Sequence, residues 1–334
     1  MNRRNFLVKS TLLAGAGVMS QAGFAKAEKH KTMDAAEYNR TRRYAKLPVS
    51  NVAYVERGHG RVALFLHGFP LNSFQWKGAL ERLSKHRRCI ALDFMGIGHT
   101  QTPEGQDISP VAQAEMLAMF LDKLSIEIVD LVGSDSGGAV AQIFTAKYPN
   151  RVRTLLLTNC DTDENSPPPS FIPFLEAAKK GLLADGMARQ LADKTLARSA
   201  KGLGGLTYTD PANLTDEAVD YYFSPIFSSP LKRKQFEQYA VDLGVNHMVA
   251  IRSELQKSTV PVRIVWGMAD DIFEYKWAEW LDRTFPKSHG IRRVEGAKLF
   301  FPEEMPGLMA EELLAHWAYA GNLHALVESF PLIY

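Results

Sequence analysis

The sequence from residue 128 runs Ile128-Val129-Asp130-Leu131-Val132-Gly133-Ser134-Asp135-Ser136-Gly137-Gly138-Ala139-Val140-Ala141. Its first part is short and rich in Val, Ile and Leu, which is typical of a buried strand. Its last part consists of small residues with helix-forming composition. Only a few residues, flanked by glycines, are left to connect the two parts. The pattern predicts a strand that turns sharply into a helix lying close against it.

Outside this segment, short apolar runs alternate with longer stretches of helical periodicity. The predicted helices include 111–124 and 139–148, where apolar residues recur at three- and four-residue spacing. This alternation is typical of an α/β fold, with a mostly parallel sheet and helices on both faces. The predicted strands are Val52–Val55, Val62–Leu66, Cys89–Leu92, Ile128–Val132, Arg153–Thr158, Val262–Trp266 and Ile291–Val294.

The alternation is interrupted after Cys160. The segment Ser166-Pro167-Pro168-Pro169 ends it, and the pattern up to about residue 258 is helical and contains no strand. Because the sheet pattern resumes at Val262, we expect residues 162–258 to be a helical lid inserted into one α/β domain. Residues 51–161 would then form the first half of that domain and residues 259–334 the second half.

Composition excludes several classes of protein. The chain has 334 residues, of which 46% are hydrophobic and 23% are charged, as in soluble globular proteins. Lys and Arg exceed Asp and Glu only by 39 to 37, so no strong basic field attracts nucleic acid. Cys89 and Cys160 are too few for a disulfide scaffold or a Cys-rich zinc site, and we expect free core thiols. No membrane span, metal or cofactor is expected.

The N-terminus has the features of an export signal. Asn2-Arg3-Arg4-Asn5-Phe6-Leu7 resembles a twin-arginine motif, and a weakly apolar stretch follows it. Ala25-Lys26-Ala27 then has the small-x-small pattern of a signal-peptidase site. We expect residues 1–27 to be a twin-arginine signal peptide and residues 28–50 a linker or surface arm. The mature protein would be periplasmic or secreted in a bacterium, after contact with the twin-arginine export machinery.

Three further motifs accompany the strand-turn-helix segment in a fixed order. They are His67-Gly68-Phe69-Pro70, Asp93-Phe94-Met95-Gly96-Ile97-Gly98-His99-Thr100 and Trp266-Gly267-Met268-Ala269-Asp270-Asp271. With the turn at residues 133–138, which matches a nucleophile elbow, they resemble the α/β-hydrolase superfamily. The resemblance implies an eight-stranded sheet, no cofactor, and an oxyanion hole formed by the backbone N–H groups of Phe69 and Ser136.

The register of the elbow places Asp135, rather than a serine, in the nucleophile position. This resembles the branch of epoxide hydrolases and haloalkane dehalogenases, in which a carboxylate attacks carbon and water then hydrolyses the alkyl-enzyme ester. A competing register makes Ser136 the nucleophile of an esterase, although it loses the preceding glycine. The resemblance also assigns the acid to Asp270, with Asp271, one residue later, as the alternative.

The segment Gly296-Ala297-Lys298-Leu299-Phe300 departs from the family pattern, because Leu299 occupies the position of the catalytic histidine. Leucine takes no proton, so hydrolysis of an Asp135 ester lacks its usual base. His247 in the lid and Lys298 are candidate substitutes. The departure also permits a non-hydrolytic protein that only binds a ligand or carries out a lyase-like step.

The substrate expected from this branch is a small apolar epoxide or organohalide. Epoxide hydrolases use lid tyrosines to protonate the opening ring, and Tyr221, Tyr222, Tyr208 and Tyr239 are available. His67 is a further candidate for substrate binding, although it packs beneath the oxyanion loop in many relatives. Ser136 stands where haloalkane dehalogenases usually place the tryptophan that holds the halide, which weakens the organohalide interpretation.

Overall fold

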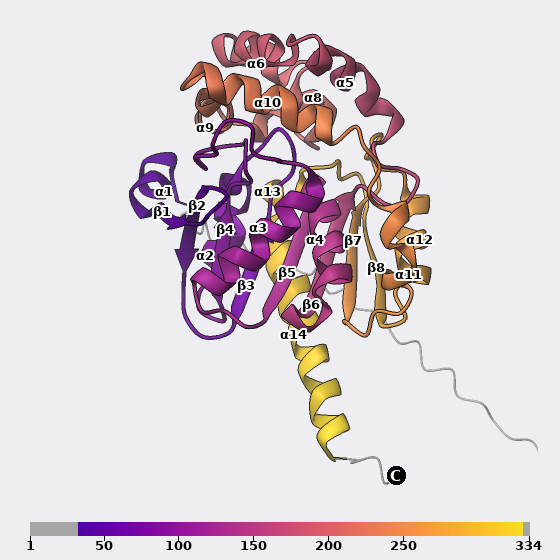
Figure 1. Ribbon diagram of the computed structural model, residues 1–334. Helices are drawn as coiled ribbons and strands as arrows, with labels where there is room; N and C mark the ends of the chain where they lie inside the picture. The colour runs from indigo at the N-terminus through magenta and orange to yellow at the C-terminus, as the bar shows by residue number, and fades with distance from the viewer. Residues whose placement is uncertain (1–32, 330–334) are drawn as a thin grey trace, which may run out of the picture. The chain divides into compact units, whose positions relative to one another are not determined.

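The computed structural model describes residues 33–329, which contain one eight-stranded sheet (Figure 1). The strand order is β1-β2-β4-β3-β5-β6-β7-β8. The first two pairs in this order are antiparallel and the others are parallel, as predicted for an α/β-hydrolase fold. The strands are β1 (Arg43–Lys46), β2 (Asn51–Arg57), β3 (Val62–Leu66), β4 (Arg88–Leu92), β5 (Val129–Asp135), β6 (Val152–Cys160), β7 (Val262–Gly267) and β8 (Ser288–Val294).

Helices cover both faces of the sheet, which is why its central strands are buried and mostly apolar. Every residue of β3 and β5 is buried, as expected for parallel strands packed on two sides. Helices α3 and α4 pack together in front of the strands in Figure 1, and α14 packs with α2 behind them. These helices are α2 (Lys77–Leu83), α3 (Pro110–Lys123), α4 (Ser136–Lys147) and α14 (Pro306–Ser329), and the second half adds α12 (Tyr275–Thr284) and α13 (Phe301–Glu304).

The N-terminal part of the domain differs from the prediction. Residues 35–46, expected to be a linker or surface arm, form α1 (Ala35–Thr41) and the edge strand β1. Only Ala45 of β1 is buried, so the strand lacks an apolar run and depends on antiparallel pairing with β2. On α1, the buried Tyr38 donates a hydrogen bond from its hydroxyl to the Ser73 carbonyl at 2.8 Å. The predicted signal peptide at 1–27 lies outside the described residues.

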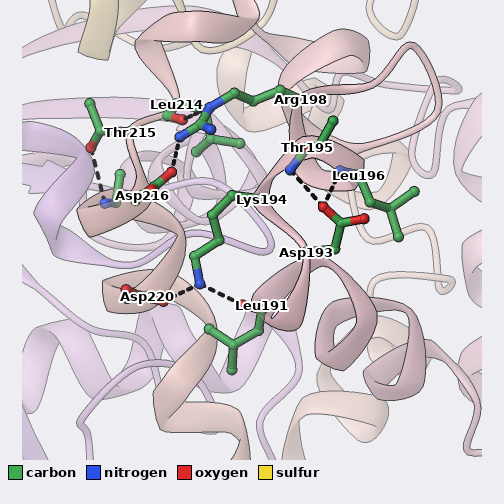
Figure 2. Close-up of polar contacts among 11 residues, drawn as sticks. Leu191, Asp193, Lys194, Thr195, Leu196, Arg198, Leu214, Thr215, Asp216 and Asp220 are labelled. Carbon is green, nitrogen blue, oxygen red and sulfur yellow. Dashed lines mark hydrogen bonds and ion pairs between the residues drawn. The ribbon is translucent and has the colours of Figure 1, made fainter.

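Seven helices lie between β6 and β7 in the sequence, and five of them (α5, α6, α8, α9 and α10) lie over the carboxyl ends of the parallel strands (Figure 1). All seven lie within the segment that was predicted to be a lid, residues 162–258, and we call this segment the lid. Helix α7 begins at a cap in which Asp193 accepts hydrogen bonds from the backbone N–H groups of Thr195 and Leu196 (Figure 2). The helices are α5 (Ile172–Lys179), α6 (Leu183–Ala192), α7 (Lys194–Arg198), α8 (Leu203–Thr207), α9 (Asp216–Phe223), α10 (Pro230–Asp242) and α11 (Arg252–Leu255).

Within the lid, ion pairs join α7 to α9. Lys194 pairs with Asp220, and Arg198 pairs with Asp216 (Figure 2). The Arg198 guanidinium also donates to the Leu214 carbonyl at 2.8 Å. Such solvent-exposed ion pairs contribute little free energy individually, and here they connect two short helices of the lid.

Hydrogen bonds from both backbone and side-chain groups attach the lid to the rest of the domain. The Phe300 N–H donates to the Thr207 carbonyl at 2.9 Å, and the Asn72 side chain donates to the Tyr221 carbonyl at 3.0 Å. The Tyr208 hydroxyl donates to Glu303 at 2.5 Å. The lid is therefore attached at two places, the segment after β3 that contains Asn72 and the segment after β8 that contains Phe300 and Glu303. Among the described residues, no helix is both long and apolar enough to cross a membrane.

The turn from β5 into α4 has no space for larger residues. A Cβ atom on Gly137 would lie 2.5 Å from the His67 carbonyl oxygen. One on Gly138 would lie 2.3 Å from the Cβ atom of Cys160, on the neighbouring strand β6. The glycines predicted to allow close packing are thus required by backbone and core atoms that do not move easily.

Gly137→Ala should lower the free energy of unfolding by about 1–3 kcal/mol, because the added methyl group overlaps the backbone of the neighbouring loop. The measurement is urea denaturation followed by circular dichroism. Gly186→Ala in α6 is the matched control, since the nearest atom to its new methyl group is 3.9 Å away. That control should gain up to about 1 kcal/mol from helix propensity. Equal stability of the two variants would contradict the packing argument.

Candidate active site

Asp135 lies at the tip of the turn between β5 and α4. Its φ is 55° and its ψ is −130°, a backbone conformation that non-glycine residues rarely adopt. Strain of this kind persists only where the surrounding structure holds it, and it is common at functional sites. The side chain is 8% exposed and lines a cavity between the sheet edge and the lid. The turn thus presents the carboxyl group to that cavity.

Two backbone N–H groups hold one oxygen of the Asp135 carboxylate. The Phe69 N–H donates to Oδ1 at 3.0 Å, and the Ser136 N–H donates to the same atom. These are the two groups predicted to form an oxyanion hole. Burial raises the pKa of Asp135 to about 6, while the two hydrogen bonds act in the opposite direction. Since both donors contact Oδ1, they leave Oδ2 available for another partner.

The cavity is small and mostly apolar, with a volume of about 110 Å³. Phe69 closes one side, where its ring stacks on Phe236 and Tyr239 of the lid. A ligand here would exchange water for aromatic and aliphatic contacts, with few polar groups to orient it. The lining residues are Phe69, Pro70, Asp135, Asp161, Pro167, Pro168, Ser170, Phe171, Phe174, Leu183, Met187, Gln190, Lys201, Leu203, Leu206, Thr207, Leu243, Ile272, Phe273 and Leu299.

A second carboxyl group, on Asp161, lines the same cavity and was not identified from the sequence. It follows Cys160, which pairs with Asp135 in the register of β5 and β6. Asp161 is 7% exposed. Burial, and then the nearby charge of Asp135, raise the pKa of Asp161 to about 8. Asp161 could have been identified from the sequence by its position, because it follows the strand next to the one that ends in Asp135, and ligands bind at the carboxyl ends of such strands.

Asp270 lies at the end of β7, as predicted, but beside the cavity and not among its lining residues. Its Oδ2 accepts a hydrogen bond from the Asn159 side chain at 2.7 Å, and its Oδ1 accepts one from the Ile272 N–H at 2.9 Å. Burial raises the pKa of Asp270 to about 7. The alternative acid, Asp271, is exposed.

Leu299 does line the cavity and is 1% exposed. No imidazole therefore lies at the position that the family gives to its histidine. The two candidate substitutes lie elsewhere: the Lys298 ammonium donates to the Gly205 carbonyl at 2.7 Å, and His247 is a partly exposed residue of the lid. Neither is among the lining residues of the cavity.

The residues suggested for substrate binding also lie outside the cavity lining. The buried ring of His67 contacts the Gly68 carbonyl through Nδ1 at 2.9 Å and accepts from the Phe94 N–H through Nε2 at 3.2 Å. Both ring nitrogens are therefore used in holding the oxyanion loop. Tyr221 accepts a hydrogen bond from Arg42 at 2.5 Å and stacks on the buried Phe74, and Tyr222 is buried in the core.

Ser136 and the lid residue Tyr239 place two further hydroxyl groups near Asp135. Both hydroxyls are buried and lack a hydrogen-bond partner among the described residues. Burial raises the pKa of Tyr239, the Ser136 side chain lowers it, and the charges of Asp135 and Asp161 raise it further. Because no histidine lines the cavity within the described residues, nothing there activates Ser136 as a nucleophile.

Residues 62–304 match the alpha/beta hydrolase fold family. The chain belongs to this family. It is 25% identical to epoxide hydrolase 2 of Caenorhabditis elegans, over 81% of this chain and 78% of that protein. It is 23% identical to haloalkane dehalogenase 2 of Mycobacterium bovis, over 79% of this chain and 90% of that protein.

A solved structure of epoxide hydrolase CorEH without ligand is also similar, with a TM-score of 0.69 and 21% identity over 83% of this chain and 98% of that one. The chain spans only 30% and 49% of the length of two other curated relatives that it matches. These similarities agree with the family match. Among the residues that the structure describes, no group of three or more His, Cys, Asp or Glu side chains is arranged to hold a metal ion.

The three buried carboxyl groups of the site should make the fold less stable as the pH rises. Each has a raised pKa in the folded protein, to about 6 for Asp135, about 7 for Asp270 and about 8 for Asp161. The folded state therefore binds protons that an unfolded aspartate releases near pH 4. The free energy of unfolding should fall from about pH 4 and level off above about pH 8.

Asp161→Asn should remove part of this pH dependence and raise the free energy of unfolding at pH 8 by more than about 1 kcal/mol relative to its effect at pH 5. Urea denaturation at both pH values measures the difference. Asp271→Asn makes the same change of charge at an exposed position and controls for net charge alone. An equal effect of Asp161→Asn on the free energy of unfolding at the two pH values would contradict the burial argument.

Proposed function

We propose that this protein is an exported hydrolase in which Asp135 attacks a carbon atom of a small apolar epoxide or organohalide and forms an alkyl-enzyme ester. The observation that carries the proposal is the pair of N–H groups on Oδ1 of Asp135. Water then hydrolyses the ester at its carbonyl carbon, which regenerates the carboxylate and releases the product.

The geometry suits an aspartate better than a serine nucleophile. When Oδ2 attacks the substrate, Oδ1 becomes the carbonyl oxygen of the ester and is already in contact with the Phe69 and Ser136 N–H groups. In the second step Oδ1 carries the negative charge of the tetrahedral intermediate, and preorganised N–H donors stabilise such a charge. The same two donors therefore serve the step in which they are needed without rearrangement.

The cavity supports the proposed substrate class. Its small volume and apolar lining favour a compact molecule with few polar groups. Two relatives are named as an epoxide hydrolase and a haloalkane dehalogenase, and their names are consistent with an electrophilic carbon atom as the target of Asp135. An esterase that uses Ser136 has less support, since Asp135 lines the cavity whereas Ser136 is not among its lining residues.

Leu299 favours a second candidate function, a protein that binds such a ligand without turnover. This alternative predicts saturable binding with no covalent adduct and no product.

The nucleophile is tested by incubating the intact protein with small epoxides and alkyl halides, followed by mass spectrometry and peptide mapping. We expect a mass increase on the peptide that contains Asp135, and loss of that adduct in Asp135→Asn. Ser136→Ala keeps its backbone N–H and should still form the adduct, so it is the matched control. Unchanged turnover in Asp135→Asn would contradict the proposal.

The rate of alkylation by an alkyl halide should increase with pH and level off above about pH 6, because only the ionised Asp135 is a nucleophile. A halide leaves as an anion and needs no proton donor, so the rate should not fall again at higher pH. Single-turnover adduct formation measured between pH 4.5 and pH 8 provides the test. A rate that does not change across this range would exclude an aspartate with a pKa near 6 as the attacking group.

Export is also proposed, from the motif at Arg3-Arg4 and the small residues at Ala25-Lys26-Ala27. In a bacterium that carries the twin-arginine machinery, the full chain should be recovered from the periplasm or medium with residue 28 as its new N-terminus. Replacing both arginines by lysine should keep the precursor inside the cell. Secretion of that variant at the normal level would contradict the twin-arginine assignment.

A further inference from the structure

Asp161 is the one buried ionisable group among the described cavity-lining residues that the mechanism above does not use. It shares the cavity with Asp135, from the adjacent strand. The β5–β6 register places Cys160 opposite Asp135, so Asp161 is the next residue beyond that pair at the carboxyl edge of the sheet. Two carboxyl groups at this edge, lining one cavity of about 110 Å³, both have access to the same small ligand.

The surroundings of Asp161 contain few groups that would neutralise it. Asp135 faces it from β5, Cys160 precedes it on β6, and Tyr239 faces it from α10. The Ser166 side chain, at the start of the lid, acts in the opposite direction to burial and lowers the pKa of Asp161. Lys201 lines the outer part of the cavity and is exposed. Asp270 adds a further acidic group, whose charge interacts with that of Asp135.

We propose that Asp161 is the acid-base residue of the Asp135 reaction and that the substrate is an epoxide: Asp161 gives its proton to the opening ring and later recovers one from water. This inference rests on the proposed function, since it assigns the proton transfers of that reaction. It also supplies a base for the second step, which the family's histidine would provide and which Leu299, at the position of that histidine, does not.

The first half-reaction starts with ionised Asp135 and protonated Asp161. Oδ2 of Asp135 forms a bond to one epoxide carbon, and the bond from that carbon to the ring oxygen breaks. The ring oxygen takes the proton of Asp161 and becomes a hydroxyl group. The products are a hydroxyalkyl ester on Asp135 and an ionised Asp161, so the charge has moved from one carboxyl group to the other.

The second half-reaction starts from that ester, one water molecule and ionised Asp161. Asp161 takes a proton from water as the water oxygen bonds to the ester carbonyl carbon, and the charge develops on Oδ1 in the oxyanion hole. The bond between the carbonyl carbon and the alkyl oxygen, formerly Oδ2, then breaks. Of the two protons of water, one ends on the diol and the other on Asp161. Asp135 is again ionised and Asp161 protonated, so one epoxide and one water give one diol.

The electrostatics of the pair change in the direction that each step requires. While Asp135 is ionised, burial and the adjacent charge raise the pKa of Asp161 to about 8, so it holds a proton at neutral pH. Once Asp135 is an ester its charge is gone, and ionised Asp161 becomes more favourable. Retaining glycosidases use the same principle, in which one carboxyl group acts first as acid and then as base.

This role favours an epoxide over an organohalide. The oxygen of an opening epoxide needs a proton, whereas a halide leaves as a stable anion and needs none. With an epoxide, the first step itself converts Asp161 into the base that the second step uses, whereas with an organohalide Asp161 has to lose its proton to water first. The two substrate types therefore separate the two roles of Asp161 experimentally.

The test compares wild type with Asp161→Asn, using a small apolar epoxide and an alkyl bromide of similar size as probes. Single-turnover mass spectrometry follows the adduct on the Asp135 peptide. With the epoxide, adduct formation in Asp161→Asn should be slower by at least about 100-fold, the usual contribution of a general acid. With the bromide, the adduct should form at nearly the normal rate but persist, because no base activates water.

A pH profile gives an independent readout. The wild-type rate of adduct formation with the epoxide should rise through about pH 6 as Asp135 ionises and fall through about pH 8 as Asp161 loses its proton. The falling limb should be absent in Asp161→Asn. Asp271→Asn, an exposed carboxylate near Asp270, is the matched control and should behave as wild type.

The possible failures can be told apart. If Asp161→Asn forms and hydrolyses both adducts at the wild-type rates, the role of Asp161 is overturned while the Asp135 nucleophile stands. If neither wild type nor Asp161→Asn gives an Asp135 adduct or product with either probe, the proposed function fails and this inference fails with it. Circular dichroism of Asp161→Asn confirms that the variant is folded in either case.

Discussion

Two N–H groups on one carboxylate oxygen are the constraint on which the site depends. The Phe69 N–H comes from the loop after β3 and the Ser136 N–H from the start of α4, so their shared contact with Oδ1 joins three segments. The contact requires the positive φ of Asp135 and the close approach of α4 to the loop at His67. Small residues at 137 and 138 make that approach possible. The chemistry of the site is thus fixed by backbone packing.

Burial of the carboxyl groups links the stability of the fold to its proposed activity. Asp135, Asp161 and Asp270 are all removed from water, and burial is the largest cause of the raised pKa of each. Burying charged groups costs free energy, which the apolar strands β3 and β5 offset by their own burial. Burial raises the pKa of Asp135 to about 6, and burial together with the charge of Asp135 raises that of Asp161 to about 8. A nucleophile and a proton donor of one residue type then differ only in their surroundings.

The sequence predicted the α/β-hydrolase fold because periodicity and motif order both depend on local residues. Asp135 and Ser136 are neighbours in one short turn, and Phe69 meets them because the strand before it, β3, pairs with β5. Strand β1 was missed, since an edge strand with one buried residue has no apolar pattern and forms only through its pairing with β2. Asp161 was missed for a related reason, because its importance comes from the strand register and not from a motif. His247, Lys298 and Tyr221 were plausible from chain order, but the paths of the lid and the last loop place them outside the cavity lining.

The central claim is that a covalent ester forms on Asp135, and oxygen-18 labelling tests it most directly. Enzyme in excess is mixed with a small epoxide in oxygen-18 water for a single turnover, and both the product and the Asp135 peptide are analysed by mass spectrometry. Attack of water on the ester carbonyl predicts that the label enters the Asp135 carboxylate and that the first-turnover diol carries none. Label in that diol, with an unlabelled Asp135 peptide, would show that water attacks the substrate directly and would contradict the account.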